Sequence, residues 1–434
     1  MAIAAKLFFD AADTEKQTLH RRITLSDDQF REQQDSWNAL AEHLISDLKE
    51  RSGYSISTWL QGSYKLATQI RPARMGDELD IDLGVYFQWQ GEPGDGEHSP
   101  EVLKDFVRQS LQAFEEGNPD VVKEVAKPKT RCERIRYKSA FHIDVPAYHL
   151  DPDADQRCLA TEDGWEDSDP KAIYVWFRDA FDEQERAKVR RQIRYLKSWA
   201  ALNFAEARSR PSSILLTVLV SEAALKLAQM GDDDETLAAI VDGIIDRLGA
   251  DDDVPNPVDK SESLVRLSED DMAAFVEMLH KLQNIAARAR NCETELAAAD
   301  VWQEAFGHLF PMPEIEAQLT ETTKWLPVAF NIPDIEVTAV PRNAVTKCYR
   351  GTNSIGPIPK DCDIYFSVTN PAALPANATV VWMVRNEGAE AENINDMGHY
   401  AGTGLKAQEY SAYRGTVVFR AELSRVFHRE VSHL

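Results

Sequence analysis

Strict alternation of apolar and polar side chains between Glu78 and Phe87 is the feature that most limits how this chain can fold. Asp80 and Asp82 fall on one side of this segment, and the opposite side is apolar: Leu79, Ile81, Leu83, Val85 and Phe87. Successive side chains of a β-strand point to opposite faces, so the pattern predicts a strand with one buried face. The Cα atoms of the two aspartates would then lie about 6.5–7 Å apart on the other face. Residues 141–148 repeat the pattern, with Asp144 on the polar side.

Three carboxylates on neighbouring strands are suited to binding metal ions. Two metal ions in a phosphoryl-transfer site lie about 3.5–4 Å apart, which acids on adjacent strand positions can bridge and flank. Mg²⁺ prefers hard oxygen ligands and completes its shell with water and phosphate. Upstream, Gly62 lacks a Cβ and lets a phosphate approach the backbone, and Ser63 adds a hydroxyl donor. The alternative for Asp80 and Asp82 is the solvent-facing side of an edge strand.

The periodicity of the remaining chain predicts an α/β (α+β) protein of three parts. Helical spacing occupies residues 26–50 and 102–114, and helices dominate from 171 to about 310. Beyond Pro311, short β-branched and aromatic runs between Pro, Gly and Asn turns predict a β-sandwich. We therefore expect a catalytic core in residues 1–170, a helical lobe in 171–310 that closes the site, and a β-rich domain in 311–434.

Composition limits the classes of partner. The chain has 48 Lys and Arg against 72 Asp and Glu, a formal net charge of −24. Such an acidic protein repels duplex nucleic acid, so a small anionic substrate carried with Mg²⁺ is the expected ligand and stable nucleic-acid binding is not. The five cysteines form no C-x-x-C pair, which predicts reduced thiols. Without a secretory h-region or a long apolar stretch, we expect a cytoplasmic protein that does not contact membranes.

Three motifs in a fixed order resemble the bacterial cGAS/DncV-like nucleotidyltransferases, which are second-messenger synthases of anti-phage defence. The motifs are Q-G-S-Y-K-L-A-T-x-I-R-P from Gln61, D-E-L-D-I-D-L-G-V-Y from Asp77 and H-I-D-V-P-A-Y from His142. The resemblance covers roughly residues 55–270 and implies a polymerase-beta-like core. It also implies two Mg²⁺ ions, with Mn²⁺ as a substitute, held by the catalytic Asp80, Asp82 and Asp144. It places the donor triphosphate at Gln61, Gly62 and Ser63.

The same resemblance adds nucleotide-binding positions outside these motifs. They are Arg134, Ser168, Lys197 and Ser213, with Asp259 and Ser261 near the acceptor nucleotide. Arg190, Arg194 and Lys197 share one helical stripe whose charge would complement a triphosphate; the alternative is a solvated helix face. For Ser213 the alternative is an N-cap. We expect His142 to lie beside the metal acids rather than to be a ligand, since Mg²⁺ prefers oxygen.

The C-terminal part resembles the β-rich sensor-like module that is often fused to these synthases. The matching runs are G-P-I-P-K-D-C-D-I-Y-F-S-V-T-N-P, V-V-W-M-V-R-N-E-G, H-Y-A-G-T-G-L-K-A-Q-E and S-A-Y-R-G-T. After Gly415 and Thr416 the family usually continues with a strand pair. Residues 417–434 are basic here and are predicted to be partly helical.

These observations imply a cyclic oligonucleotide synthase that releases pyrophosphate at each bond. The resemblance favours ATP and GTP as substrates and a cyclic GMP-AMP as product, which would act on a separate effector protein. One alternative is a polymerase that makes linear oligoadenylate or modifies an RNA end, which the charge of −24 disfavours. Another is a non-catalytic nucleotide sensor, which would not need all three acids. A transferase that nucleotidylates a protein is a further alternative.

Overall fold

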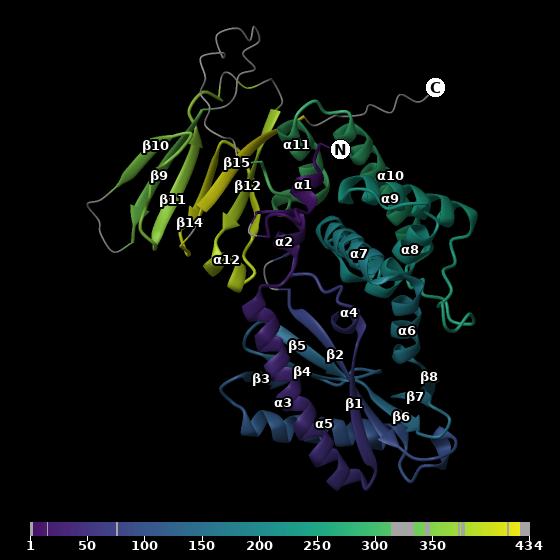
Figure 1. The fold of residues 1–434 in the computed structure, drawn as a ribbon. Helices are drawn as coiled ribbons and strands as arrows, with labels where there is room; N and C mark the ends of the chain where they lie inside the picture. Colours follow the sequence, from purple (N-terminus) through teal and green to yellow (C-terminus); the bar gives the residue numbers. More distant parts are fainter. Residues whose placement is uncertain are drawn as a thin grey trace, which may run out of the picture. The chain divides into compact units, whose positions relative to one another are not determined.

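The computed structural model describes residues 3–14, 16–74, 77–313, 334–342, 348–371, 374, 378–414 and 416–425. The chain divides into two compact units, Met1–Phe310 and Pro311–Leu434. Figure 1 labels their helices and strands.

An eight-stranded sheet organises the first half of unit 1. The strand order is β3-β4-β5-β2-β6-β7-β8, and β1 pairs with β2 outside this path. The strands are β1 Ser55–Gln61, β2 Leu79–Gln88, β3 Val122–Val125, β4 Glu133–Tyr137, β5 Phe141–Val145, β6 Ala147–Asp151, β7 Gln156–Thr161 and β8 Gly164–Asp167. The predicted strand at 78–87 is confirmed as β2. The predicted strand at 141–148 is split at Pro146 into β5 and β6, which pair in parallel with the first and second halves of β2.

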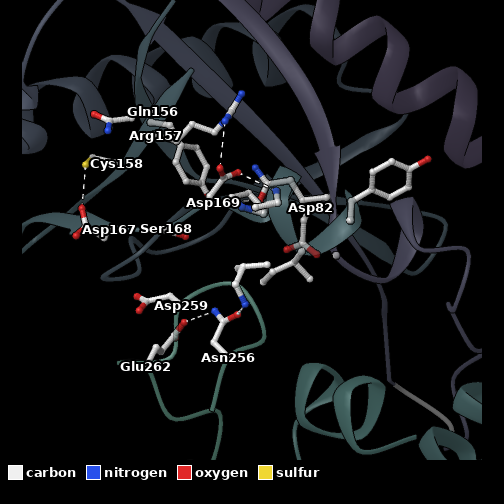
Figure 2. Close-up of a pocket in the computed structure, with 18 of the residues that line it drawn as sticks. Asp82, Gln156, Arg157, Cys158, Asp167, Ser168, Asp169, Asn256, Asp259 and Glu262 are labelled. Carbon is white, nitrogen blue, oxygen red and sulfur yellow. Dashed lines mark hydrogen bonds and ion pairs between the residues drawn. The ribbon is translucent and has the colours of Figure 1, made fainter. Parts of the chain in front are cut away.

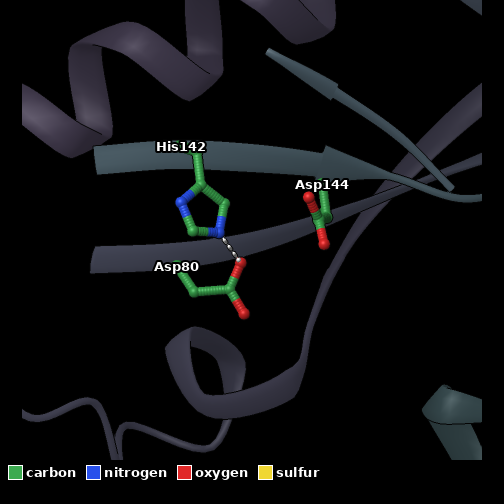
Figure 3. Close-up of side chains that lie close together, drawn as sticks. All are labelled: Asp80, His142 and Asp144. Carbon is green, nitrogen blue, oxygen red and sulfur yellow. Dashed lines mark ion pairs between the residues drawn. The ribbon is translucent and has the colours of Figure 1, made fainter. Parts of the chain in front are cut away.

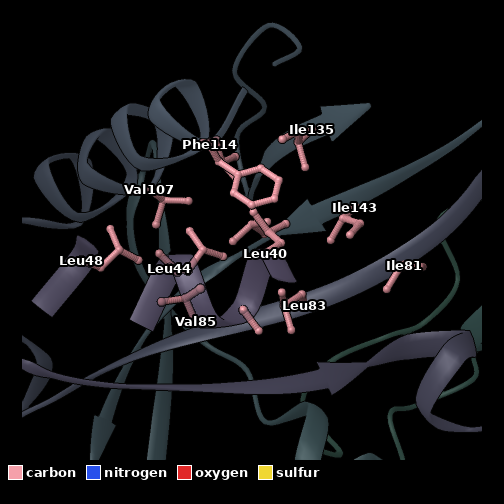
Figure 4. Close-up of a cluster of buried hydrophobic side chains, with 14 of the residues drawn as sticks. Leu40, Leu44, Leu48, Ile81, Leu83, Val85, Val107, Phe114, Ile135 and Ile143 are labelled. Atoms are coloured by element: carbon pink, nitrogen blue, oxygen red, sulfur yellow. The ribbon is translucent and has the colours of Figure 1, made fainter. Parts of the chain in front are cut away.

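Two long helices cover the apolar face of this sheet. They are α3 (Asp27–Ser52) and α5 (Pro100–Gly117), and they confirm the helical spacing read from the sequence. Ser26 starts α3 with a capping box, and Gly53 ends it in the left-handed conformation. Figure 4 shows the resulting cluster, in which leucines of α3 meet branched side chains of β2 and β5. Because this face is filled, the polar side chains of β2 and β5 are left on the opposite face.

The second half of unit 1 is helical, as predicted. Its helices are α6 Pro170–Ala180, α7 Glu183–Asn203, α8 Ser213–Leu225, α9 Asp233–Ala250, α10 Glu269–Arg290 and α11 Glu295–Phe306. The short N-terminal helices α1 (Ala5–Phe8) and α2 (Leu19–Ile23) pack against α9 and α7. Phe8 is fully buried, and its ring lies edge-on to those of Tyr195 and Trp302. In the part of the chain that the structure describes, no helix has the length and apolar character needed to cross a bilayer.

The acidic stretch 151–170 contains structure that sequence reasoning missed. Strands β7 and β8 lie within it and form an antiparallel pair that extends the sheet beyond β6. Arg157 on β7 forms ion pairs with Asp155 and Asp169. These local ion pairs compensate part of the negative charge of the stretch. That charge was the reason why the sequence did not predict strands here.

Unit 2 is built from two antiparallel sheets of orders β10-β9-β11-β14 and β13-β12-β15. Its elements are β9 Ile335–Pro341, β10 Tyr349–Thr352, β11 Cys362–Val368, β12 Ala378–Glu387, α12 Ala389–Asn393, β13 Gly398–Thr403, β14 Lys406–Tyr410 and β15 Thr416–Arg425. Val337 and Phe366 of the first sheet share one buried cluster with Trp382 of the second, as a sandwich requires. The helical prediction for 417–434 is wrong over 417–425, which pairs along β12 as strand β15; residues 426–434 lie outside the described part.

Candidate active site

Strand register places the predicted acids side by side. Asp82 on β2 is the Cα partner of Asp144 on the parallel strand β5, and of Gln61 on the antiparallel strand β1. Arg134 on β4 is in turn the partner of Asp144. These four residues therefore form one row across four strands, and partners in such a row have side chains on the same face. Asp80 lies two positions before Asp82 on the same face of β2.

The acids differ in how their charge is compensated. Asp144 accepts hydrogen bonds from Arg134 Nε at 2.5 Å and Nη2 at 2.8 Å, and from Lys129 Nζ at 3.1 Å. Burial opposes ionisation of Asp144, but these two cations outweigh it and hold its pKa below the usual value. At Asp82, burial and the nearby charges of Asp80 and Asp144 raise the pKa to about 8. The protein thus pairs Asp144 with two cations, whereas the charges of Arg134 and Lys197 only partly offset the rise in the pKa of Asp82.

The arrangement of donor atoms fits a divalent cation. Asp80, His142 and Asp144 each offer one ligand atom, and these atoms lie within 4.8 Å of one another (Figure 3). Carboxylate oxygens are the ligands that Mg²⁺ and Mn²⁺ accept. Burial and then the charges of Asp80 and Asp144 raise the pKa of Asp82, and a bound cation would oppose these effects. Asp80, Asp82 and Asp144 are the residues that would hold such ions.

His142 lies next to these acids, as expected from the sequence. Its Nε2 lies 2.9 Å from Asp80 Oδ1, and its Nδ1 lies 3.0 Å from Glu78 Oε2. The ring is buried, with 8% of its side chain exposed, so it is fixed between two carboxylates. Glu78 and His142 therefore limit the directions in which the Asp80 carboxylate can turn.

The Gly-Ser turn contacts the same acids. Gly62 has φ +56, and a Cβ placed on it would lie 2.0 Å from Asp82 Oδ2. Glycine is therefore required both by backbone conformation and by the closeness of Asp82. Ser63 follows in the short helix α4 (Gly62–Lys65), and its carbonyl accepts a hydrogen bond from the Thr68 amide at 2.8 Å.

Gln61 has a supporting role. Its side-chain amide donates to the Tyr86 hydroxyl at 3.0 Å, and its carbonyl oxygen accepts from the Tyr148 hydroxyl at 3.1 Å. The two tyrosine rings stack with centroids 4.9 Å apart. Gln61 thus links β1 to the wall of the site through its side chain.

A cavity of about 620 Å³ opens in front of the turn (Figure 2). Of the positions predicted from the sequence, it is lined by Gln61, Gly62, Asp82, Ser168 and Asp259. Two further side-chain pairs line it that sequence reasoning missed: Asn256 with Glu262, and Cys158 with Asp167. Neither pair belongs to a motif, because each joins residues that only the fold brings together.

The basic stripe of α7 contacts the protein backbone in this structure. Its three cations donate hydrogen bonds to consecutive backbone carbonyls of residues 66–69, directly after the Gly-Ser turn. The bonds are Arg190 to Leu66 at 2.8 Å, Arg194 to Ala67 at 2.7 Å and to Gln69 at 3.2 Å, and Lys197 to Thr68 at 2.9 Å. The stripe is therefore neither a solvated face nor a free anion site in this structure. It fixes the segment that supports the turn.

The other predicted contacts have these positions. Lys197 is buried, and burial together with the charge of Arg194 lowers its pKa to about 8, although Asp80 and Asp82 act in the opposite direction. Ser213 is exposed as the first residue of α8, and Ser212 is the N-cap that accepts from the Leu215 amide. Among the described residues that line the cavity, neither Lys197 nor Ser213 is present.

Comparisons with known proteins find similarity to a part of each unit. The family described as Cyclic GMP-AMP synthase DncV-like, nucleotidyltransferase domain, matches residues 56–148, and the Adenylyl/Guanylyl and SMODS C-terminal sensor domain matches residues 314–425. A Cyclic GMP-AMP synthase of Escherichia albertii is 28% identical over 413 residues, which cover 94% of this chain and 89% of that protein. A c-di-GMP synthase of Roseivirga ehrenbergii is 23% identical, over 60% of this chain and 75% of that protein.

Solved structures agree on the fold. The Vibrio cholerae DncV cyclic AMP-GMP synthase in complex with a linear intermediate, 5′ pppA(3′,5′)pG, matches with a TM-score of 0.60 and 19% identity. The match covers 71% of this chain and 96% of that chain. The predicted fold class is thereby confirmed.

Proposed function

Because the chain carries a DncV-like nucleotidyltransferase domain followed by a sensor domain of the Adenylyl/Guanylyl and SMODS C-terminal type, we propose that it is a cyclic dinucleotide synthase. It would join two ribonucleoside triphosphates and release one pyrophosphate at each bond. ATP and GTP are the proposed substrates and a cyclic GMP-AMP the proposed product. The names of the relatives support this choice.

The observation that carries the proposal is the row of Gln61, Asp82 and Asp144 across three strands, with Asp80 beside it. We assign Asp80, Asp82 and Asp144 as the catalytic metal-binding acids. Two Mg²⁺ ions, or Mn²⁺, would when bound lower the pKa of the acceptor hydroxyl and neutralise triphosphate charge. A site that collects three acids, of which Asp82 lines the cavity, would need such ions to admit a polyanion.

The remaining residues would position the nucleotides. Gly62 and Ser63 would hold the donor phosphates against β2, supported by Gln61. The further nucleotide contacts that we propose are Arg134, Ser168, Lys197 and Ser213. Of these four residues Ser168 lines the cavity, whereas Arg134, Lys197 and Ser213 do not.

The proposal includes the three domains, with their separate roles, that the sequence predicted. Residues 1–170 form the catalytic core, residues 171–310 close the site, and residues 311–434 form the sensor-like domain. The product would act in the cytoplasm on a separate effector protein, as a second messenger in anti-phage defence. The free thiols of all five cysteines are compatible with a reducing compartment.

Product analysis tests the proposal directly. Purified protein is incubated with the four ribonucleoside triphosphates and Mg²⁺ or Mn²⁺, treated with phosphatase, and the products are identified by mass spectrometry. We expect a phosphatase-resistant cyclic dinucleotide that disappears in the variant Asp80→Asn, Asp82→Asn. A ladder of linear products would indicate a polymerase instead, and full activity of the double variant would refute the metal assignment.

A further inference from the structure

A triphosphate at the Gly-Ser turn needs positive charge from the protein, and the cations predicted to supply it are engaged elsewhere. Arg190, Arg194 and Lys197 hold the carbonyls of residues 66–69. A further cation on the cavity side would add to the charge that Lys197 and bound Mg²⁺ are proposed to supply. Such a cation should line the cavity and should not be neutralised by a carboxylate.

Four lysine or arginine side chains line the cavity, and three of them are paired with acids. The three ion pairs are Arg131 with Glu166 at 2.5 Å, Arg157 with Asp169 at 3.2 Å, and Arg266 with Glu262 at 3.4 Å. The fourth of these cavity-lining cations is Lys65. Within the described residues, no carboxylate lies within ion-pair distance of the Lys65 ammonium group. Its charge is therefore available to a ligand.

Lys65 is instead held by two aromatic rings. Its Nζ lies 4.0 Å from the ring centroid of Trp59 on β1 and 5.0 Å from that of Tyr174 on α6. Cation–π contacts of this kind are weaker than a charge-assisted hydrogen bond to phosphate oxygen, so a phosphate within reach would draw the ammonium group away. The rings keep the side chain extended beside the cavity until then.

The position of Lys65 fits the turn. Lys65 follows Gly62 by three residues and is the last residue of the short helix α4. Both residues line the cavity, together with Asp82. An anion bound against the Gly62 backbone would therefore share this cavity with the Lys65 side chain.

We propose that Lys65 is a substrate-binding residue that contacts the triphosphate chain of the nucleotide held at Gly62 and Ser63. This inference rests on the proposed function, because it assigns the triphosphate to that same site. The recognised chemistry is a polyphosphate rather than a base or a ribose. Lys65 therefore contributes affinity for any nucleoside triphosphate without selecting the base.

Equilibrium binding separates this role from a structural one. Full-length protein and the variants Lys65→Met, Lys65→Arg and Lys171→Met are titrated calorimetrically in Mg²⁺ with α,β-methylene ATP, with tripolyphosphate and with AMP. Lys171 is the matched control, because its ammonium group is already paired with Asp155 at 3.2 Å. The α,β-methylene bridge prevents bond formation, so the titrations report binding alone.

We expect Lys65→Met to weaken the binding of both triphosphate ligands by about tenfold or more, since a charge-assisted hydrogen bond is lost. AMP binding should change little, Lys65→Arg should keep most of the affinity, and Lys171→Met should match the parent protein. Equal affinities in Lys65→Met and Lys171→Met would overturn the inference, as would an equal loss for AMP and the triphosphates.

The same titrations distinguish failure of the inference from failure of the proposed function. A parent protein that shows the Lys65-dependent preference for triphosphates but makes no cyclic product would support Lys65 and refute the synthase. If the parent protein makes the cyclic product and Lys65→Met binds triphosphates normally, the synthase is supported and the role of Lys65 is refuted. Absence of triphosphate binding by the parent protein would refute both.

Discussion

Replacing Gly62 by alanine tests whether the turn and the metal acids work as one unit. The added Cβ would lie 2.0 Å from Asp82 Oδ2 and 3.0 Å from its Cγ. The clashing atoms belong to the end of a side chain that can rotate. The substitution should therefore displace the Asp82 carboxylate rather than unfold the protein.

The expected cost to stability follows from the backbone. Gly62 has φ +56, and an L-residue with left-handed geometry costs about 1–2 kcal/mol. For a unit of this size that corresponds to a decrease in Tm of about 2–4 °C per kcal/mol. A displacement of about 1 Å at a metal ligand can reduce turnover about 100-fold. The loss of activity should thus be much larger than the loss of stability.

Gly53 provides the matched control. It has φ +77 at the end of α3, and a Cβ placed on it would meet no atom within 4 Å. Gly53→Ala should show the same backbone cost without an effect on catalysis. Thermal unfolding and the initial rate of cyclic product formation are measured for both variants. If Gly62→Ala is as active as Gly53→Ala, the proposed contact between the turn and Asp82 is irrelevant to the chemistry, and the reasoning fails.

Two further predictions concern the electrostatics of the site. The pKa of Asp82 in the folded protein is raised to about 8 from an ordinary value near 4. The contribution of Asp82 to stability is therefore fully present below about pH 4 and is lost as the pH rises to about 8. Thermal unfolding of the metal-free protein should show this loss of stability, and Asp82→Asn should make the loss smaller. Arg194→Met removes the hydrogen bonds to the carbonyls of Ala67 and Gln69 and should lower kcat about tenfold or more with a smaller change in KM, because the turn loses its support. Arg186→Met on the same helix, whose guanidinium donates to the Phe181 carbonyl, is the control, and equal kcat values for the two variants would argue against a positioning role.

The sequence was sufficient for the elements that carry the acids. Alternation around Asp80 and Asp82 requires a strand with one buried face, and the pattern around Asp144 requires another. It was not sufficient for their pairing, because the parallel register between β2 and β5 joins residues more than sixty positions apart. Local periodicity contains no information on such long-range partners. The resemblance supplied the expectation that the acids meet, and the register supplies the geometry.

Side-chain partners show what the sequence could not reveal about the cations of α7. The cations of α7 were assigned to phosphate because a helical wheel shows only that they share a face. The structure shows that the face is opposed by four backbone carbonyls, which three cations satisfy. Conversely, the sequence offered no reason to predict a binding role for Lys65. Whether a carboxylate pairs with its ammonium group depends on the folded cavity and not on the neighbours of Lys65 in the chain.

The acid cluster bears on how a protein with a charge of −24 could assemble the polyanion site that we propose. Asp144 is neutralised by Arg134 and Lys129, so the sheet can fold with this carboxylate buried. Within the described residues Asp82 forms no ion pair, and its raised pKa favours the protonated form at neutral pH. Asp82 can thus accept a divalent cation by releasing a proton, whereas Asp144 must exchange one of its two protein cations. Metal affinity should therefore rise with pH through Asp82 and should rise when Lys129 is replaced by methionine, because Asp144 then has one competitor fewer.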